Sequence, residues 1–272
     1  MKTRIISGAL IILVVALVLT AQIYLPFILV AFIALAAAVA VYEVLWATGI
    51  TKNKIIVAAG MLPAVLVPFA LQGYINIPLS VIFTVYAGVI FALTLKFHSK
   101  LEITAVVSAI ALPIVISYAF GSLCFIIQNG KMGIFHLLLV LCWSAIADTG
   151  AYFTGVLIGK HKMARVISPK KTWEGFAGGM FFSLLFTLLL GILFKNVYGY
   201  NVEILYTLLL TPLFVVLGVM GDLSASLIKR KCGIKDFGKL IPGHGGILDR
   251  FDSILMISPF FMIVLNYIAV IK

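Results

Sequence analysis

Charged residues are scarce in this chain of 272 residues, since Asp, Glu, Lys and Arg together make up only 11% of it. Soluble globular domains carry roughly 25% charged residues and about 45–50% apolar ones. Here 63% of the residues are hydrophobic, and the mean hydropathy is +1.22. The shortage of charge excludes an ordinary soluble domain and predicts an integral membrane protein.

Cysteine is also scarce. Cys124, Cys142 and Cys232 are far apart in the sequence, and no CxxC pair occurs. This excludes both a disulfide framework and a cysteine zinc site. We interpret two of the three as buried apolar residues and the third as a loop residue. A signal-peptide cleavage site is likewise missing after Met1–Arg4, so we expect the first apolar run to be a retained helix.

Long apolar runs dominate the rest of the sequence. A helix needs about 20 apolar residues to cross the hydrocarbon core. We therefore predict an all-α protein with about nine transmembrane helices. The runs cover 5–22, 25–46, 55–72, 79–95, 101–127, 132–158, 177–194, 205–227 and 254–271. No internal repeat or long linker divides the chain. We expect one polytopic domain over 1–272, with N-terminal helices in 1–130 and catalytic helices and cytoplasmic loops in 131–272.

The basic residues fit this arrangement. Nine crossings place all but three of the 20 Lys and Arg on one side, the exceptions being Lys131, Lys195 and Lys272. Because cytoplasmic loops are enriched in Lys and Arg, that side is predicted to be cytoplasmic, together with the N-terminus. Topology thereby explains much of the net charge of +11, and nucleic-acid binding is not needed to account for it.

Acidic residues are the rarest charged group, with nine in the chain. An ionisable group inside a membrane helix is costly and indicates function. Asp148 and Asp222 both lie in apolar runs, close to a predicted cytoplasmic loop. Ser226 and Lys229 or Arg230 follow Asp222 at helical spacing, so they share its face. For each Asp a purely structural ion pair remains the alternative.

Two polar loops, near 159–176 and 228–253, interrupt the apolar sequence. The first contains SPKKTWEG (168–175), in which Pro169 fixes a turn and Glu174 adds an acid that topology does not require. The second contains PGHGGILDRFD (242–252). Its glycines expose backbone amides that could cradle phosphate, although it is not a Walker loop. Carboxylates beside cations in a glycine-rich setting suit Mg²⁺ and phosphate, and His244 is either a base or a hydrogen-bonded loop residue.

The stretch from Ser226 to Asp252 closely resembles the signature of phosphatidate cytidylyltransferases, and DTGAYFTG (148–155) and ISPKKTWEG (167–175) are similar to further blocks of that family. The resemblance covers roughly residues 145–253. It implies an all-helical, homodimeric membrane enzyme that transfers CMP from CTP to phosphatidic acid with Mg²⁺, giving CDP-diacylglycerol and pyrophosphate. The compact size of the chain favours the plasma membrane of a prokaryote. Whether a monovalent cation assists is left open.

The resemblance also implies roles for individual residues. Asp222 and Asp249 are expected to hold the metal. The residues expected to neutralise the phosphates or assist catalysis are Lys229, Arg230, Lys235, Asp236, His244, Arg250 and Asp252. Those expected to bind substrate are Asp148, Ser168, Lys170, Lys171, Thr172, Glu174, Ser226, Gly245 and Gly246.

Two other functions share some of these features. A transporter would place its charges near the bilayer midplane and often shows inverted repeats, whereas the acids here gather toward one side. A lipid kinase would also need Mg²⁺ and basic loops, but it would release a nucleoside diphosphate and not pyrophosphate. A purely structural scaffold would have no need of the glycine-rich loop.

Overall fold

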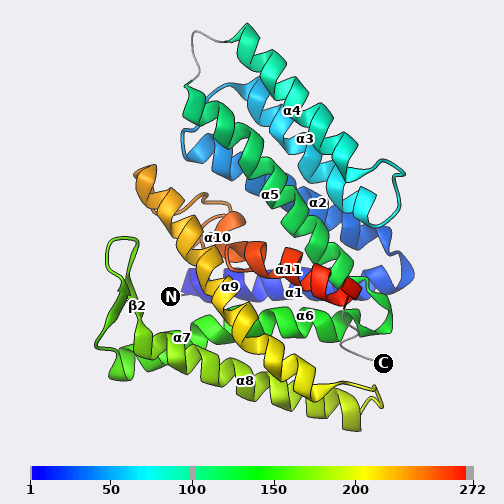
Figure 1. The fold of residues 1–272 in the computed structure, drawn as a ribbon, viewed down its shortest axis with the longest axis vertical. Coiled ribbons are helices and arrows are strands. Elements are labelled where there is room, and N and C mark those ends of the chain that lie inside the picture. The colour runs from blue at the N-terminus through cyan, green and yellow to red at the C-terminus, as the bar shows by residue number, and fades with distance from the viewer. Residues whose placement is uncertain (1, 98–101, 268–272) are drawn as a thin grey trace. The chain divides into compact units, whose positions relative to one another are not determined.

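A computed structural model describes residues 2–97 and 102–267, and helices dominate these ranges (Figure 1). Side chains are described from Ile6 onward. Of the basic residues used above for topology, Lys100 and Lys272 lie outside the described residues, as do the side chains of Lys2 and Arg4.

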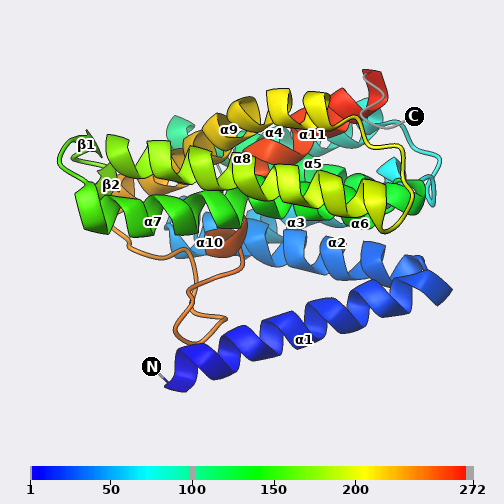
Figure 2. The same ribbon diagram turned by 90° about the horizontal axis from the view of Figure 1, so that it is seen from below.

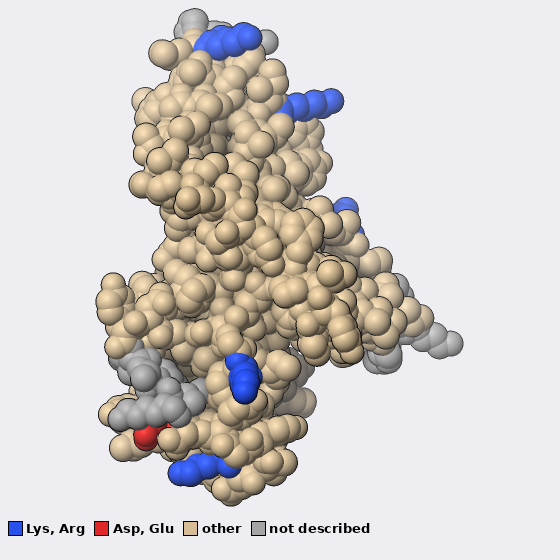
Figure 3. Space-filling view, turned by 90° about the vertical axis from the view of Figure 1, so that its right-hand side faces the viewer, with Lys and Arg blue, Asp and Glu red and all other residues tan. Residues whose placement is uncertain are grey.

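Eight helical stretches in the described part of the chain are long and apolar enough to cross a membrane. They are Ile6–Tyr24, Phe27–Ala47, Lys54–Leu71, Leu79–Lys96, Ile103–Ile127, Gly130–Ile158, Trp173–Asn196 and Ile204–Lys231. The ninth predicted run forms a shorter apolar helix, α11 (Ile254–Tyr267). The all-α membrane class is confirmed, and the number of crossings stays a prediction. Charged side chains are few on the face in Figure 3, as expected for a surface in contact with lipid.

The chain divides into two compact units, and each is described by itself. The first unit combines Met1–Gln128 with Lys229–Phe251. Its helices are α1 (Lys2–Tyr24), α2 (Phe27–Tyr42), the π-helical η1 (Glu43–Ala47), α3 (Lys54–Leu71), α4 (Leu79–Lys96), α5 (Ile103–Ile127), α10 (Leu248–Phe251) and the last turn of α9 (Ile204–Lys231). Helix α3 packs against α2, α4 and α5 (Figure 1). Small residues permit this contact: a Cβ on Gly60 would lie 2.9 Å from Leu45 Cδ1.

The second unit combines Asn129–Ile228 with Asp252–Lys272. Its elements are η3 (Gly130–Met132), α6 (Gly133–Leu141), the π-helical η4 (Cys142–Ile146), α7 (Ala147–Ile158), β1 (Lys162–Ala164), β2 (Ser168–Thr172), α8 (Trp173–Asn196), most of α9, and α11. The two strands form an antiparallel hairpin in which Lys162 pairs with Thr172. This hairpin connects α7 to α8, and the two helices run side by side (Figures 1 and 2).

Glycine brings α7 and α8 together. A Cβ on Gly179 would lie 2.5 Å from the carbonyl oxygen of Ala147, and one on Gly175 would lie 2.6 Å from that of Ala151. The small residues therefore act in helix packing, which is the usual use of glycine in membrane helices.

The predicted division of the single domain between residues 130 and 131 stays a prediction. The border between the units falls close to it, between Gln128 and Asn129. The segment Lys229–Phe251, however, groups with the N-terminal helices, where Glu43 accepts hydrogen bonds from its Ile247 and Leu248 amides.

Candidate active site

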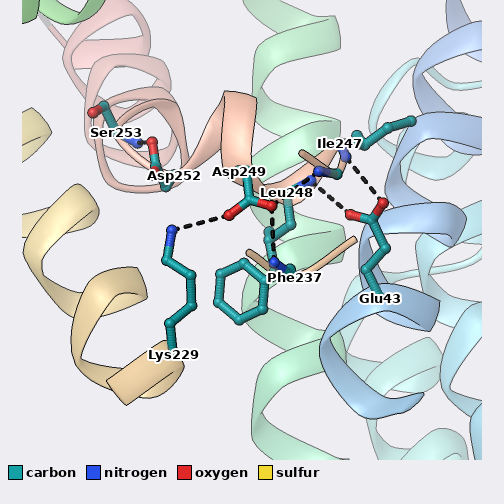
Figure 4. A network of polar contacts seen from close by, with 9 residues as sticks. Glu43, Lys229, Phe237, Ile247, Leu248, Asp249, Asp252 and Ser253 are labelled. Carbon is teal, nitrogen blue, oxygen red and sulfur yellow. Dashed lines mark hydrogen bonds and ion pairs between the residues drawn. The ribbon is translucent and has the colours of Figure 1, made fainter. Parts of the chain in front are cut away.

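The polar stretch after α9 is organised around the buried carboxylate of Asp249 (Figure 4). Its Oδ1 accepts a hydrogen bond from Lys229 Nζ at 2.9 Å. Its Oδ2 accepts two more, from the Phe237 amide at 2.8 Å and the Gly246 amide at 2.9 Å. A buried charge is tolerated only when it is paired and hydrogen-bonded. One side chain thus connects the end of α9 to both sides of the glycine-rich loop.

Lys229 is held on two sides. Its side chain is only 12% exposed, and its ammonium group lies 5.1 Å from the centre of the buried Phe237 ring while it pairs with Asp249. A cation over an aromatic face gains from the ring quadrupole when water is excluded. The ammonium group is therefore fixed in place before any ligand arrives.

A second buried carboxylate, that of Glu43, holds the next residues of the same stretch (Figure 4). Glu43 is the first residue of η1. Its Oε1 accepts from the Ile247 amide at 3.1 Å, and its Oε2 accepts from the Leu248 amide at 2.9 Å. Glu43 was not among the site residues predicted from the sequence, although it is the only acidic residue before Glu102 and interrupts an apolar run.

An open cavity of about 610 Å³ lies within the glycine-rich loop. Among its lining residues are five of the predicted site residues, Lys235, Asp236, His244, Gly245 and Arg250. Lys239 adds a third cation beside one carboxylate. The excess of positive charge suits a polyanionic ligand.

Tight backbone turns shape this cavity. Gly243 and Gly245 have φ of +78° and +84°, a region that residues with a Cβ rarely adopt. The turn closes through the Ile241 amide, which donates to the Gly245 carbonyl at 2.9 Å, and through the His244 amide, which donates to the Ile241 carbonyl at 2.9 Å. These glycines are required by the turn itself.

His244 is oriented by the first helix of the chain. Ser7 Oγ lies 2.9 Å from the Pro242 carbonyl oxygen and 2.9 Å from His244 Nδ1. A carbonyl can only accept, so the hydroxyl donates its proton there and must accept from His244 Nδ1–H. This contact requires a proton on Nδ1 of the imidazole. Figure 2 shows the loop reaching the N-terminal end of α1.

In the second unit, Lys171 of β2 gathers two predicted carboxylates. Its Nζ lies 2.5 Å from Asp222 Oδ2 and 3.9 Å from Asp148 Oδ1. Ser253 Oγ donates to Asp148 Oδ2 at 3.5 Å. A Cβ on Gly221 would lie 2.5 Å from the carbonyl oxygen of Asp252, so α9 approaches the start of α11 closely at this point. Asp148 and Asp222 thus share one cation.

The remaining residues predicted in the hairpin have mainly local partners. Thr172 is buried and caps α8, accepting from the Gly175 amide at 3.1 Å. Glu174 turns back to the hairpin, where it accepts from the amides of Lys160 and His161 and pairs with His161 Nδ1 at 2.5 Å. Ser168 begins β2, and Lys170 of the same strand is exposed. These contacts stabilise the hairpin that carries Lys171.

Three other predicted residues lie beside these clusters. Ser226 and the exposed Arg230 are one turn apart near the end of α9. Asp252 Oδ1 accepts from the Ser253 amide at 2.8 Å.

The two predicted metal ligands fall in different units, Asp222 in the second and Asp249 in the first. A shared ion therefore stays a prediction. Within residues 2–97 and 102–267 there is no group of three or more His, Cys, Asp or Glu side chains that could hold a metal. Mg²⁺ often takes only one or two protein carboxylates and completes its shell with water and phosphate. The Asp148–Asp222 pair, now neutralised by Lys171, fits that requirement.

The arrangement supports the chemistry of phosphate esters. It offers a fixed ammonium group, a cationic cavity, and a carboxylate pair suited to a hard divalent cation. Phosphoryl transfer depends mainly on positioning and on charge stabilisation, so no nucleophilic side chain is needed.

Comparison with known proteins identifies the family. The profile of the Cytidylyltransferase family matches residues 2–268. Among similar curated proteins, the phosphatidate cytidylyltransferase of Bacillus subtilis is 46% identical over 133 residues, which are 49% of this chain and 47% of that protein. The Staphylococcus saprophyticus protein of the same name is 39% identical over 150 residues, 55% of this chain and 56% of its own. The chain matches about half the length of these relatives. Because the family profile extends along almost the entire sequence, this chain belongs to the Cytidylyltransferase family.

Proposed function

We propose that the protein is a phosphatidate cytidylyltransferase, which transfers CMP from CTP to phosphatidic acid. The observation that carries the proposal is the polar loop between two apolar helices. In it, Lys229 and Asp249 form a buried ion pair, and cationic side chains line a cavity. One substrate is a lipid and the other a soluble polyanion, so the enzyme needs a cationic site on a membrane-embedded frame. The names of the relatives support this substrate pair.

In the proposed reaction, a phosphate oxygen of phosphatidic acid attacks the α-phosphorus of CTP. A new P–O bond forms, the bond between the α-phosphorus and the β-bridging oxygen breaks, and pyrophosphate carries away the electron pair. Lys235, Lys239 and Arg250 line the cavity and would neutralise the triphosphate and the leaving group. Lys229 would offer a fixed positive charge at the base of the loop.

Mg²⁺ is proposed as the cofactor, held by Asp222 and Asp249, with Asp148 beside Asp222. Bound there, it would neutralise phosphate charge and polarise the phosphoryl oxygens. Without the metal, Lys171 offsets part of the negative charge of Asp148 and Asp222, since its ammonium group lies within 4 Å of both carboxylates.

We further propose that the loops and the N-terminus face the cytoplasm of a bacterium and that the protein is a homodimer. The distribution of Lys and Arg supports the first proposal, and the resemblance to the family supports the second. Accessibility of single introduced cysteines at Lys131 and Lys162 in intact cells tests the orientation, since the two positions are predicted on opposite sides. The mass of the protein–detergent complex tests the dimer.

The activity is tested with purified protein in detergent, phosphatidic acid, labelled CTP and Mg²⁺. The expected result is lipid-soluble label with an equal amount of pyrophosphate, both abolished by EDTA. A lipid product formed with release of a nucleoside diphosphate would instead identify a kinase. Folded protein that transfers nothing from CTP, with several phosphatidates and divalent cations, would refute the proposal.

A further inference from the structure

The carboxylate of Glu43 lies against the backbone of the glycine-rich loop, far from it in sequence. Glu43 is 4% exposed and begins the π-helical turn η1 at the end of an apolar helix. A buried carboxylate in a membrane helix is costly unless donors surround it. Here the amides of Ile247 and Leu248 each donate to one of its oxygens, at 3.1 and 2.9 Å.

Two glycines make room for this carboxylate. A Cβ on Gly238 would lie 2.3 Å from Glu43 Oε1, and a Cβ on Gly246 would lie 2.4 Å from each of its oxygens. Real Cβ atoms are essentially never closer than 3.0 Å to a neighbouring atom. Both glycines, on opposite sides of the cavity-forming turn, are thus placed where only a bare backbone fits beside Glu43.

The contacts of Glu43 and Asp249 are complementary. Asp249 binds the amides of Phe237 and Gly246, and Glu43 binds those of Ile247 and Leu248. Three consecutive amides, Gly246 to Leu248, therefore donate to carboxylates of this chain. A π-helical turn is a frequent local feature of functional sites, and η1 supplies Glu43 from a part of the chain outside the signature.

We infer that Glu43 is a positioning residue: its carboxylate holds the Gly246–Leu248 backbone so that Asp249, Lys229 and the cationic cavity keep their geometry. Between the buried side chains of Phe237 and Leu248, the loop is otherwise made of turns and one isolated bridge. The catalytic part of this inference rests on the proposed function. The structural part, in which Glu43 holds the loop in place, does not.

The first experiment measures amide exchange of the purified protein by mass spectrometry, with Glu43→Gln as the variant and Glu43→Asp as a second. Glutamine keeps the shape but turns an NH₂ group toward a backbone amide, and aspartate keeps the charge but is one methylene too short. Glu102→Gln is the matched control, because Glu102 is exposed at the start of α5. Exchange in the peptide covering Ile247 and Leu248 is expected to rise in both Glu43 variants, and exchange in α3 and α5 is expected to stay unchanged.

The second experiment is a double-mutant cycle on cytidylyl transfer. Gly246→Ala pushes a methyl group onto the Glu43 carboxylate, and Glu43→Asp withdraws that carboxylate. A displacement of the loop by about 1 Å is expected to lower kcat about 100-fold in each Glu43 variant. The double variant Glu43→Asp/Gly246→Ala is expected to be about tenfold more active than the product of the two single effects predicts.

The outcomes separate the two parts of the inference. Unchanged exchange at Ile247 and Leu248 in both Glu43 variants overturns the fastening. Raised exchange with unchanged kcat and KM in an active enzyme overturns the positioning role. Purely multiplicative effects in the cycle overturn the direct contact between Glu43 and Gly246. If the wild-type protein transfers no CMP at all, the proposed function fails, and the exchange experiment still decides whether Glu43 holds the loop.

Discussion

Replacing both members of the buried pair Lys229–Asp249 should destabilise the protein by less than the two single replacements added together. The two side chains are 12% and 3% exposed, so solvent screens their interaction little. Asp249→Asn leaves the Lys229 ammonium buried against Phe237 with an NH₂ group or a weaker acceptor opposite it. Breaking a buried pair in this way costs about 3–5 kcal/mol.

Lys229→Met should lower the free energy of unfolding by less than Asp249→Asn does. The Asp249 carboxylate then keeps both backbone donors, the amides of Phe237 and Gly246. The loss is one charge-assisted hydrogen bond, about 1.5–3 kcal/mol. In the double variant no unpaired ammonium remains, so its destabilisation is expected to fall about 2 kcal/mol short of the sum of the singles. That difference corresponds to roughly a 30-fold change in the folded-to-unfolded ratio.

The assay is reversible unfolding by SDS in mixed micelles, followed by tryptophan fluorescence. Trp46 stacks on Tyr42 in the first unit and reports on its state. Lys52→Met is the control, since Lys52 is exposed at the start of a loop. Additivity within about 0.5 kcal/mol, or an Asp249→Asn variant as stable as the control, would refute the assignment of a coupled buried pair. The double variant should still lack transfer activity, because both charges are proposed to serve the reaction.

Three further predictions follow from single contacts. Ser7→Ala should lower the free energy of unfolding by about 1 kcal/mol. It should also let His244 sample both neutral tautomers, which the ¹⁵N spectrum of labelled imidazoles distinguishes, whereas Ser7→Thr should keep the wild-type tautomer. Lys171→Met leaves two carboxylates facing each other, so Mg²⁺ should raise the melting temperature of this variant more than that of the wild type; an equal rise in both would contradict a divalent site there. Gly179→Ala should destabilise the protein by about 1–3 kcal/mol, because its Cβ meets backbone at 2.5 Å. Gly88→Ala, with open space around its Cβ, should stay within about 0.5 kcal/mol of wild type, and similar losses in both would refute the close packing of α7 on α8.

The fold class was predictable because the membrane imposes it. Backbone amides in lipid must be satisfied within the segment, so long apolar runs become helices whatever their neighbours. The eight long apolar helices follow the predicted runs closely. The ninth run contains Pro259 and Asn266, and its described part forms the shorter helix α11.

The site was predictable in part. Polar residues in an apolar sequence are visible, so Asp148, Asp222 and Asp249 could be selected on physical grounds. What spacing could not supply was the partner of each acid. Lys171 was predicted to bind substrate, which stays a prediction, and its ion pairs with Asp148 and Asp222 were not foreseen. Thr172 and Glu174 were expected to touch substrate, and their observed contacts are a helix cap and a hairpin.

Glu43 shows why long-range contacts escape such reasoning. Like Asp148 and Asp222, Glu43 is an acid inside an apolar run, and such an acid indicates function. It was not selected, and its partners lie more than 200 residues away. Backbone amides carry no sequence signal, so an acid that binds only amides leaves no complementary residue to find.

The glycines of PGHGG and its surroundings therefore have at least two separate physical causes. Gly243 and Gly245 are needed for their positive φ angles, and Gly238 and Gly246 are needed because Glu43 occupies the space of their missing side chains. Exposed amides that could cradle phosphate are a third cause predicted from the sequence. In this structure the amides from Gly246 to Leu248 bind carboxylates of the protein, so the proposed reaction would depend on the cationic side chains of the cavity for phosphate recognition. A glycine-rich loop in a membrane protein can thus be built to accept a buried acid from its own helical frame.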